Sequence, residues 1–202
     1  QVSKMAEETI KEFSRIDILV NNAGANFVKP TLEMTEQDWD KVIGIDLKGA
    51  FLCSQHVLKY MVRQKSGAII NISSVHSYAT LPMAAPYAAA KGGIVSMTKS
   101  MAIEFAPLGI RINCLSPGLT DTKIWQDIKS AGKNEKEVID FWMRHIPLKR
   151  VQTVQEVGKV ALFLASDDSS YITGDNIFSD GGMVAMLIGE SKEAVATLEQ
   201  WK

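Results

Sequence analysis

The sequence predicts an α/β fold whose strands form one parallel, doubly wound sheet. Short apolar runs of strand length alternate along the chain with longer segments in which apolar residues recur at helical spacing. This alternation is typical of parallel sheets covered by helices on both faces. With 202 residues, 46% of them hydrophobic, the chain can build one substantial core but not two full domains. We therefore expect residues 1–202 to form a single domain.

Four predicted strands and four predicted helices follow one another along the chain. The short apolar runs that predict strands are residues 16–20, 68–73, 111–116 and 176–179. The segments with helical spacing are residues 2–13, 35–64, 83–105 and 153–165. Thr35 with Asp38, and Thr153 with Glu156, have the spacing of capping pairs, which predicts that helices begin there. Pro86 falls in the first turn of its helix, where a missing amide is tolerated.

Composition and charge argue against several classes of function. A net charge of -1, with both signs interspersed, leaves no basic stripe for a nucleic acid. The longest apolar runs are too short to span a membrane, and the first residues do not have the pattern of a signal peptide. Cys53 and Cys114 provide neither a disulfide framework nor metal-ligand spacing. We expect a cytoplasmic protein with two reduced core thiols, no metal, and no nucleic-acid or membrane partner.

A serine, a tyrosine and a lysine occupy positions that suit acid–base chemistry on a carbonyl group. Ser74 follows a predicted buried strand, and open α/β sheets bind ligands at the carboxyl ends of their strands. Tyr87 and Lys91 are four residues apart in the next predicted helix, so both project from one face. Because an ammonium favours a phenolate, we expect Lys91 to lower the pKa of Tyr87 from about 10 toward neutrality. Ser74 then holds the substrate oxygen; its neighbour Ser73 points the other way if the strand alternation continues.

These residues, in this order, resemble those of the short-chain dehydrogenase/reductase family. The family's other motifs are present as Asn21-Asn22-Ala23-Gly24, Arg111-Ile112-Asn113 with Pro117-Gly118 and Thr122, and Asp180-Gly181-Gly182. A lone Tyr-x-x-x-Lys occurs often by chance, but four ordered motifs at the family's spacing do not. The resemblance covers nearly the whole chain.

The resemblance implies a Rossmann-like fold and the NAD(P)-dependent interconversion of an alcohol and a carbonyl by hydride transfer. It implies that Tyr87 transfers the proton, Lys91 tunes Tyr87 and binds the nicotinamide ribose, and Ser74 orients the oxygen of a small alcohol or ketone. The residues implied to contact NAD or NADP are Asn21, Ala23, Gly24, Tyr87, Lys91, Pro117, Gly118, Thr120 and Thr122. Without the resemblance, residues 117–122 also fit a plain turn after a strand.

The family's opening strand and glycine-rich turn, of the type Thr-Gly-x-x-x-Gly-x-Gly, have no counterpart in the sequence. Those glycines let the backbone approach the cofactor pyrophosphate at a helix N-terminus. The resemblance therefore predicts that the chain lacks the family's first three strands, including the segment that selects NAD or NADP. The alternative to an active enzyme is a catalytically silent remnant that acts as a structural or interaction subunit.

Asp46 is the main departure from the family pattern. Members usually have asparagine in the segment that corresponds to residues 42–47, where the helix is locally distorted and a backbone carbonyl holds a water linked to the lysine. Aspartate keeps a similar shape but adds a charge and loses two donors. We expect Asp46 either to raise the pKa of Lys91 or to draw Lys91 away from Tyr87.

Residues 120–150 correspond to the family's variable substrate loop. Trp125 and Trp142 lie in it, and they either form a wall of the substrate pocket or anchor the loop to the core. His76 is two residues past Ser74 and is either a substrate contact or a solvated loop residue.

Small residues gather in the predicted helix 83–105. Ala88 to Ala90 and the pair Gly92-Gly93 permit close helix approach. The family uses this helix and helix 35–64 to build dimers and tetramers, so the resemblance implies a homodimer or homotetramer. Tight packing onto the chain's own sheet explains the small residues equally well.

Overall fold

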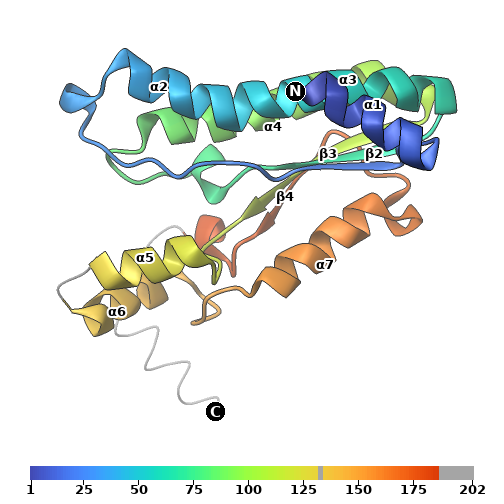
Figure 1. Cartoon of the computed structure of the whole chain (residues 1–202). Helices are drawn as coiled ribbons and strands as arrows, with labels where there is room; N and C mark the ends of the chain where they lie inside the picture. The colour runs from blue at the N-terminus through green and yellow to red at the C-terminus, as the bar shows by residue number, and fades with distance from the viewer. Residues whose placement is uncertain (132–133, 187–202) are drawn as a thin grey trace, which may run out of the picture.

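A four-stranded parallel sheet forms the centre of the computed structural model, which describes residues 1–131 and 134–186 (Figure 1). Its strands are β1 (Ile18–Asn21), β2 (Gly67–Ile72), β3 (Ile110–Pro117) and β4 (Asn176–Ser179). They lie side by side in the order β1-β2-β3-β4, with Val20 opposite Ile70 and Ile70 opposite Asn113. Because every pairing is parallel, all four strands end at one edge of the sheet, and the loops that follow them meet there.

Helices cover the two faces of the sheet, as the alternation of elements predicts. The main ones are α1 (Val2–Phe13), α2 (Glu36–Val42), α3 (Gly49–Gln64), α4 (Ala85–Phe105), α5 (Lys123–Ala131), α6 (Glu135–His145) and α7 (Val154–Ala165). One core cluster joins α1, α3 and α4 to Ile69 and Ile112 of the sheet. A second cluster joins α7 to the alternate strand residues Ala68, Ile70 and Leu115. The fold class is thus the predicted one, and no helix of the described residues is both long and apolar enough to cross a bilayer.

The helix predicted over residues 35–64 is interrupted by one wider turn. Thr35 and Asp38 form the predicted capping box at its start. Residues Ile43–Lys48 then form a π-helix, after which α3 continues to Gln64. A π-helical turn inside an α-helix is often a functional feature, and this one contains Asp46.

Two predicted boundaries were wrong by a few residues. Ile16 was expected in the first strand, but its N–H and C=O bond to the side chain of Gln64 rather than to a neighbouring strand. Met83 was expected to begin a helix, but its backbone has φ of 67°, which ends any helical run there. Helix α4 begins at Ala85 instead.

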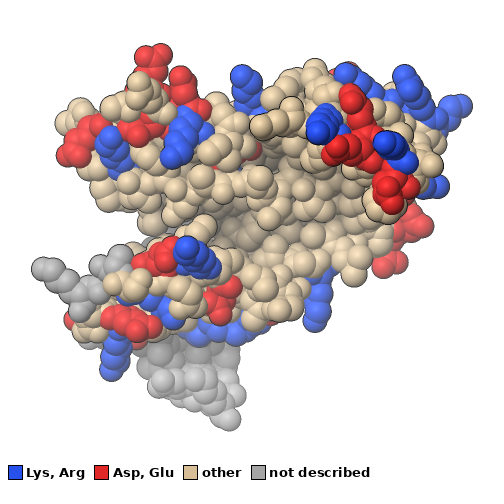
Figure 2. Space-filling view, in the orientation of Figure 1, with Lys and Arg blue, Asp and Glu red and all other residues tan. Residues whose placement is uncertain are grey.

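β1 is the first strand in the sheet order and an edge strand, and among the described residues it pairs only with β2. Ile18 and Val20, on one face of β1, remain 49% and 45% exposed. Figure 2 shows uncharged side chains over a hollowed surface in front of the sheet, with the charged ones gathered around it. This part of the sheet is therefore not covered by the described residues.

Candidate active site

The three predicted catalytic residues lie together where β2 ends and α4 begins. Ser74 follows β2 and caps a single 3-10 turn, Val75–Ser77, while Tyr87 and Lys91 lie on successive turns of α4. The Tyr87 side chain lies close enough to Ser74 for the serine hydroxyl to lower the pKa of the phenol. The Lys91 Nζ lies over the Tyr87 ring, 5.4 Å from its centroid. The chain thus brings the serine, the phenol and the ammonium into one place.

The pKa of Tyr87 differs from the sequence-based expectation. Burial raises the pKa of Tyr87 above its ordinary value, the hydrogen bond with Ser74 lowers it, and the Asp46 carboxylate raises it. Lys91 was expected to lower this pKa. Its ammonium lies over the Tyr87 ring and beside the Asp46 carboxylate.

Lys91 is buried and holds two groups of the protein. Its Nζ donates to the carbonyl of Ile72 at 3.2 Å and lies 3.2 Å from Oδ2 of Asp46. Asp46 Oδ1 in turn accepts a hydrogen bond from the N–H of Ala25 at 2.8 Å. Asp46 thus lies against Lys91, whereas Ile72 and Ala25 take part through backbone groups for which a sequence has no signal.

Gly24 lies against this ion pair. A Cβ at Gly24 would be 3.2 Å from Asp46 Oδ2 and 3.3 Å from Lys91 Nζ. The absence of a side chain therefore lets the loop after β1 approach the charged pair closely. This close approach explains why a glycine occupies the last position of the Asn21–Gly24 motif.

His76 belongs to the site rather than to open solvent. Its N–H donates to Ser74 Oγ at 3.3 Å, and its ring meets the Tyr87 ring edge to face, with centroids 5.2 Å apart. Its Nδ1 lies 2.7 Å from Oγ1 of Thr80, and burial lowers its pKa. A neutral imidazole is therefore placed next to the phenol.

Comparisons with known proteins agree with these motifs. A family profile described as "Enoyl-(Acyl carrier protein) reductase" matches residues 1–184. The 3-oxoacyl-[acyl-carrier-protein] reductase FabG of Thermotoga maritima is 40% identical over 184 residues, covering 91% of this chain and 72% of the relative. The chain belongs to the short-chain dehydrogenase/reductase family.

Solved structures have the same fold. A gluconate 5-dehydrogenase from Burkholderia cenocepacia, in complex with NADP and tartrate, matches with a TM-score of 0.87 and 34% identity, covering 93% of this chain and 72% of that one. An aldohexose dehydrogenase from Thermoplasma acidophilum matches with a TM-score of 0.89 and 31% identity, covering 95% of this chain and 77% of that one.

Three motif residues of this short-chain dehydrogenase/reductase have partners inside the protein. Asn21 donates to Asn71 Oδ1 at 2.7 Å and to Ser54 Oγ at 2.9 Å, so its amide nitrogen is used in the core. Arg111 donates to the carbonyls of Leu164 and Ser166, each at 2.9 Å, and so closes the C-terminus of α7. Asn113 donates to the carbonyl of Ile172 at 2.8 Å, which fixes the turn before β4.

The loop after β3 is tied to the end of β4. The N–H of Gly118 donates to the carbonyl of Ser179 at 2.9 Å. A Cβ at Gly118 would be 2.9 Å from the Cα of Asp180, so the two backbones approach too closely for a side chain. Thr120 Oγ1 donates to the carbonyl of Gly118 at 3.2 Å. In this short-chain dehydrogenase/reductase, the loop that begins at Pro117 is therefore held in a defined shape against the end of β4.

The segment predicted to be the substrate loop forms α5 and α6. Thr122 directly precedes α5, and its carbonyl accepts the N–H of Gln126 at 3.1 Å. Trp125 is buried, with the ammonium of Lys129 over its ring at 5.6 Å, which agrees with the anchoring alternative. The ring of Trp142 is packed against Phe141.

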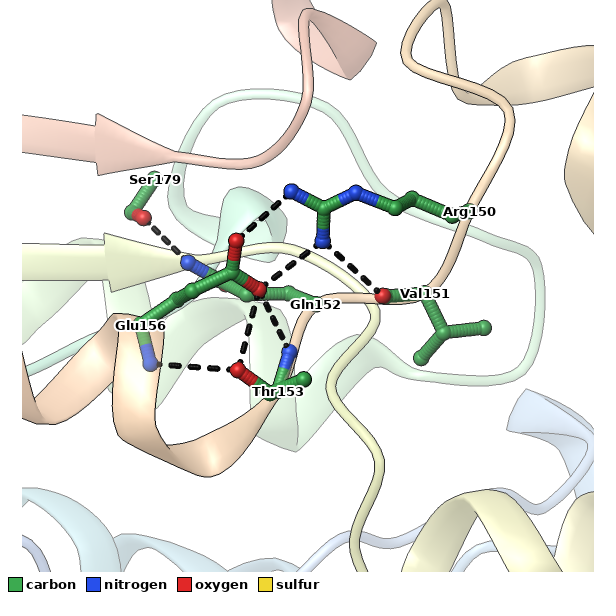
Figure 3. A network of polar contacts seen from close by, with 6 residues as sticks. All are labelled: Arg150, Val151, Gln152, Thr153, Glu156 and Ser179. Carbon is green, nitrogen blue, oxygen red and sulfur yellow. Dashed lines mark hydrogen bonds and ion pairs between the residues drawn. The ribbon is translucent and has the colours of Figure 1, made fainter.

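A cavity of about 610 Å³ lies beside the end of β4 and the start of α7. On its wall, Arg150 donates to both carboxylate oxygens of Glu156, at 2.9 and 2.6 Å, and Gln152 donates to Ser179 (Figure 3). Glu156 also completes the predicted capping box of α7. None of Ser74, Tyr87, Lys91 and Asp46 lines this cavity, although Leu119 of the loop after β3 does.

Proposed function

We propose that this chain carries the catalytic residues of an NAD(P)-dependent oxidoreductase that interconverts a small alcohol and a carbonyl compound. The observation that carries the proposal is the proximity of the Ser74 and Tyr87 side chains, with the Lys91 ammonium over the Tyr87 ring. A phenol and a serine hydroxyl at the carboxyl edge of a parallel sheet are placed to meet one substrate oxygen. The family assignment supports the same reaction class.

Each side chain has one role in this proposal. The Ser74 hydroxyl donates to the substrate oxygen and holds it next to the Tyr87 hydroxyl, which gives or takes the proton at that oxygen. Lys91 lies over the Tyr87 ring, and Asp46 and the Ile72 carbonyl orient Lys91 there. When bound, the nicotinamide cofactor supplies or accepts the hydride.

The nicotinamide end of NAD or NADP fits the residues present. An ammonium has three N–H donors, of which Lys91 gives one to the Ile72 carbonyl while it is ion-paired with Asp46. The ammonium therefore keeps donor capacity for a ribose hydroxyl. Ala23 and Gly24 are exposed beside Lys91, and the defined loop from Pro117 to Thr122 leaves the same edge of the sheet, which supports them as contacts of the nicotinamide. Relatives of this chain have been solved with NADP.

The substrate class is proposed only broadly. The names of the relatives refer to 3-oxoacyl-[acyl-carrier-protein], gluconate and aldohexose, so the shared chemistry is a secondary alcohol or ketone carrying further polar groups. His76, with its neutral ring next to Tyr87, is placed to contact such a group, and we assign it a role in substrate binding.

A comparison of two tyrosine variants tests the proposal. The purified chain is titrated with NADPH and with NADH by cofactor fluorescence, and turnover is followed by cofactor absorbance with acyl ketones, keto acids and sugars. Tyr87→Phe should keep cofactor affinity while losing about 10²- to 10⁴-fold in turnover, because only the transferable proton is removed. Tyr171→Phe, at a fully exposed site, serves as the matched control and should not change either quantity. Cofactor binding without turnover on any carbonyl compound would favour the silent subunit instead.

A further inference from the structure

Asp46 and Lys91 form an ion pair that is almost wholly removed from water. Their side chains are 0% and 5% exposed, and Asp46 Oδ2 lies 3.2 Å from Lys91 Nζ. Burying two charges is costly unless each is compensated within the protein. Here Oδ1 of Asp46 is satisfied by the N–H of Ala25, whereas Oδ2 has no hydrogen bond in the described residues. The Lys91 ammonium is therefore the group that balances this carboxylate.

The same ammonium lies next to the phenol of Tyr87. The Lys91 Nζ lies over the Tyr87 ring, 5.4 Å from the ring centroid. A carboxylate 3.2 Å from the ammonium cancels most of its field at a third group nearby. The phenolate would then form next to a pair of nearly zero net charge, in a partly buried place that disfavours the charged form.

We propose that Asp46 is a positioning residue that neutralises Lys91 beside Tyr87, so that the phenol stays protonated at neutral pH and serves as a proton donor to a carbonyl oxygen. This inference rests on the proposed function and adds a preferred direction to it. In that direction the carbonyl carbon gains a hydride from a reduced nicotinamide cofactor, and the oxygen gains the Tyr87 proton. The products are the alcohol, the Tyr87 phenolate and the oxidised cofactor.

The other titratable groups at this place do not supply a competing charge. His76 meets the Tyr87 ring from the turn after β2, and burial lowers its pKa. Cys114 of β3 is buried, and its pKa is raised to about 11, so it is an uncharged thiol. From the loop after β1, Ala25 contributes only a backbone N–H. Among the described residues, the charges that face Tyr87 at neutral pH are therefore those of Asp46 and Lys91.

Direct titration of Tyr87 tests this inference without cofactor or substrate. The chain contains four tyrosines, so labelling each ring carbon that bears the hydroxyl with ¹³C gives four resonances, and Tyr87→Phe identifies one of them. In the unsubstituted protein, Tyr87 should ionise at higher pH than the exposed Tyr78 and Tyr171, which act as internal references. Asp46→Asn keeps an oxygen for the Ala25 N–H but removes the negative charge, so the Tyr87 resonance should then titrate at lower pH. Asp46→Ser also removes the charge, with a smaller side chain, and is the second variant to use if the Asp46→Asn protein does not fold.

The matched control is Asp40→Asn, which makes the same charge change at an exposed position of α2. This control substitution should not change the pH at which Tyr87 titrates. An unchanged or raised titration pH of Tyr87 in both neutral Asp46 variants would overturn the inference, as would ionisation of Tyr87 before the exposed tyrosines in the unsubstituted chain. Because no turnover is measured, these results are independent of whether the proposed oxidoreductase activity is found.

Discussion

The hydroxyl of Ser73 donates a hydrogen bond to the main-chain carbonyl of Lys91 at 2.8 Å. Both residues are buried, so this bond joins the end of β2 to the turn of α4 that carries Tyr87 and Lys91. Ser73 and Ser74 therefore serve different purposes although they are adjacent. Ser74 faces the phenol, and Ser73 sets how α4 lies against the strand.

Replacement of each serine in turn should separate these purposes. Ser74→Ala removes a donor to the substrate oxygen and should lower turnover by about 10²- to 10³-fold with little change in stability. Ser73→Ala leaves the substrate contacts in place but loses a buried hydrogen bond, which should cost about 1 kcal/mol of unfolding free energy and about tenfold in turnover. Denaturant unfolding and steady-state kinetics measure both quantities. Equal stability losses in the two variants would contradict this division.

Arg111 should be a major contributor to stability, because its guanidinium binds the carbonyls that end α7. Arg111→Met removes the guanidinium donors from those carbonyls, which Ser169 also reaches, and should lower the free energy of unfolding by about 1–3 kcal/mol. Arg150→Met is the control. Its ion pair with Glu156 is exposed, so the loss there should be below about 1 kcal/mol. Similar losses from the two variants in urea unfolding would show that Arg111 does not have this role.

Assembly should depend on Ala89 rather than on Gly93. A Cβ at Gly93 would lie 2.8 Å from Cδ2 of Leu47, so Gly93 packs within its own chain, whereas Ala89 is exposed on α4. Phe51 of α3 and Ile103 of α4 are also exposed. If α3 and α4 form a symmetric interface, Ala89→Arg should dissociate the oligomer without lowering the melting temperature. Gly93→Arg should instead lower the melting temperature by several degrees.

Light scattering after size exclusion, together with thermal denaturation, reads out both variants. An Ala89→Arg protein that stays assembled would mean that α4 is not part of the interface. A Gly93→Arg protein as stable as the parent would mean that Leu47 moves aside at no cost.

The open side of β1 should make the isolated chain self-associate. An unpaired strand edge with exposed apolar side chains is a template for further strands. Ile18→Lys and Val20→Lys place charges on the exposed face of β1 and should reduce the aggregated fraction, measured by light scattering at increasing concentration. Leu19→Lys, on the face that packs against the core, should unfold the chain instead. Unchanged aggregation in the first two variants would show that another surface is responsible.

Much of the candidate site could be predicted because it depends on local spacing. Tyr87 and Lys91 share a helix face whenever residues 85–105 are helical, and the capping pairs at Thr35 and Thr153 work within one turn. The order of strands and helices likewise requires a parallel sheet, whose strand ends bring Ser74 to the functional edge.

The sequence by itself therefore determined the fold class and the order of the strands with the four predicted helix segments, but not α5 and α6, and it singled out the serine, tyrosine and lysine as candidates. Only the tertiary structure decided the burial and the electrostatic surroundings of those groups. Whether Lys91 lowers the pKa of Tyr87 depends on where the carboxylate of Asp46 lies, 45 positions along the chain from Lys91, and on how much water is excluded around both. The partners of that pair are the backbone groups of Ala25 and Ile72, which every residue type except proline possesses. Electrostatic fields and backbone contacts arise from distances in space, so a pattern of residue types does not contain them.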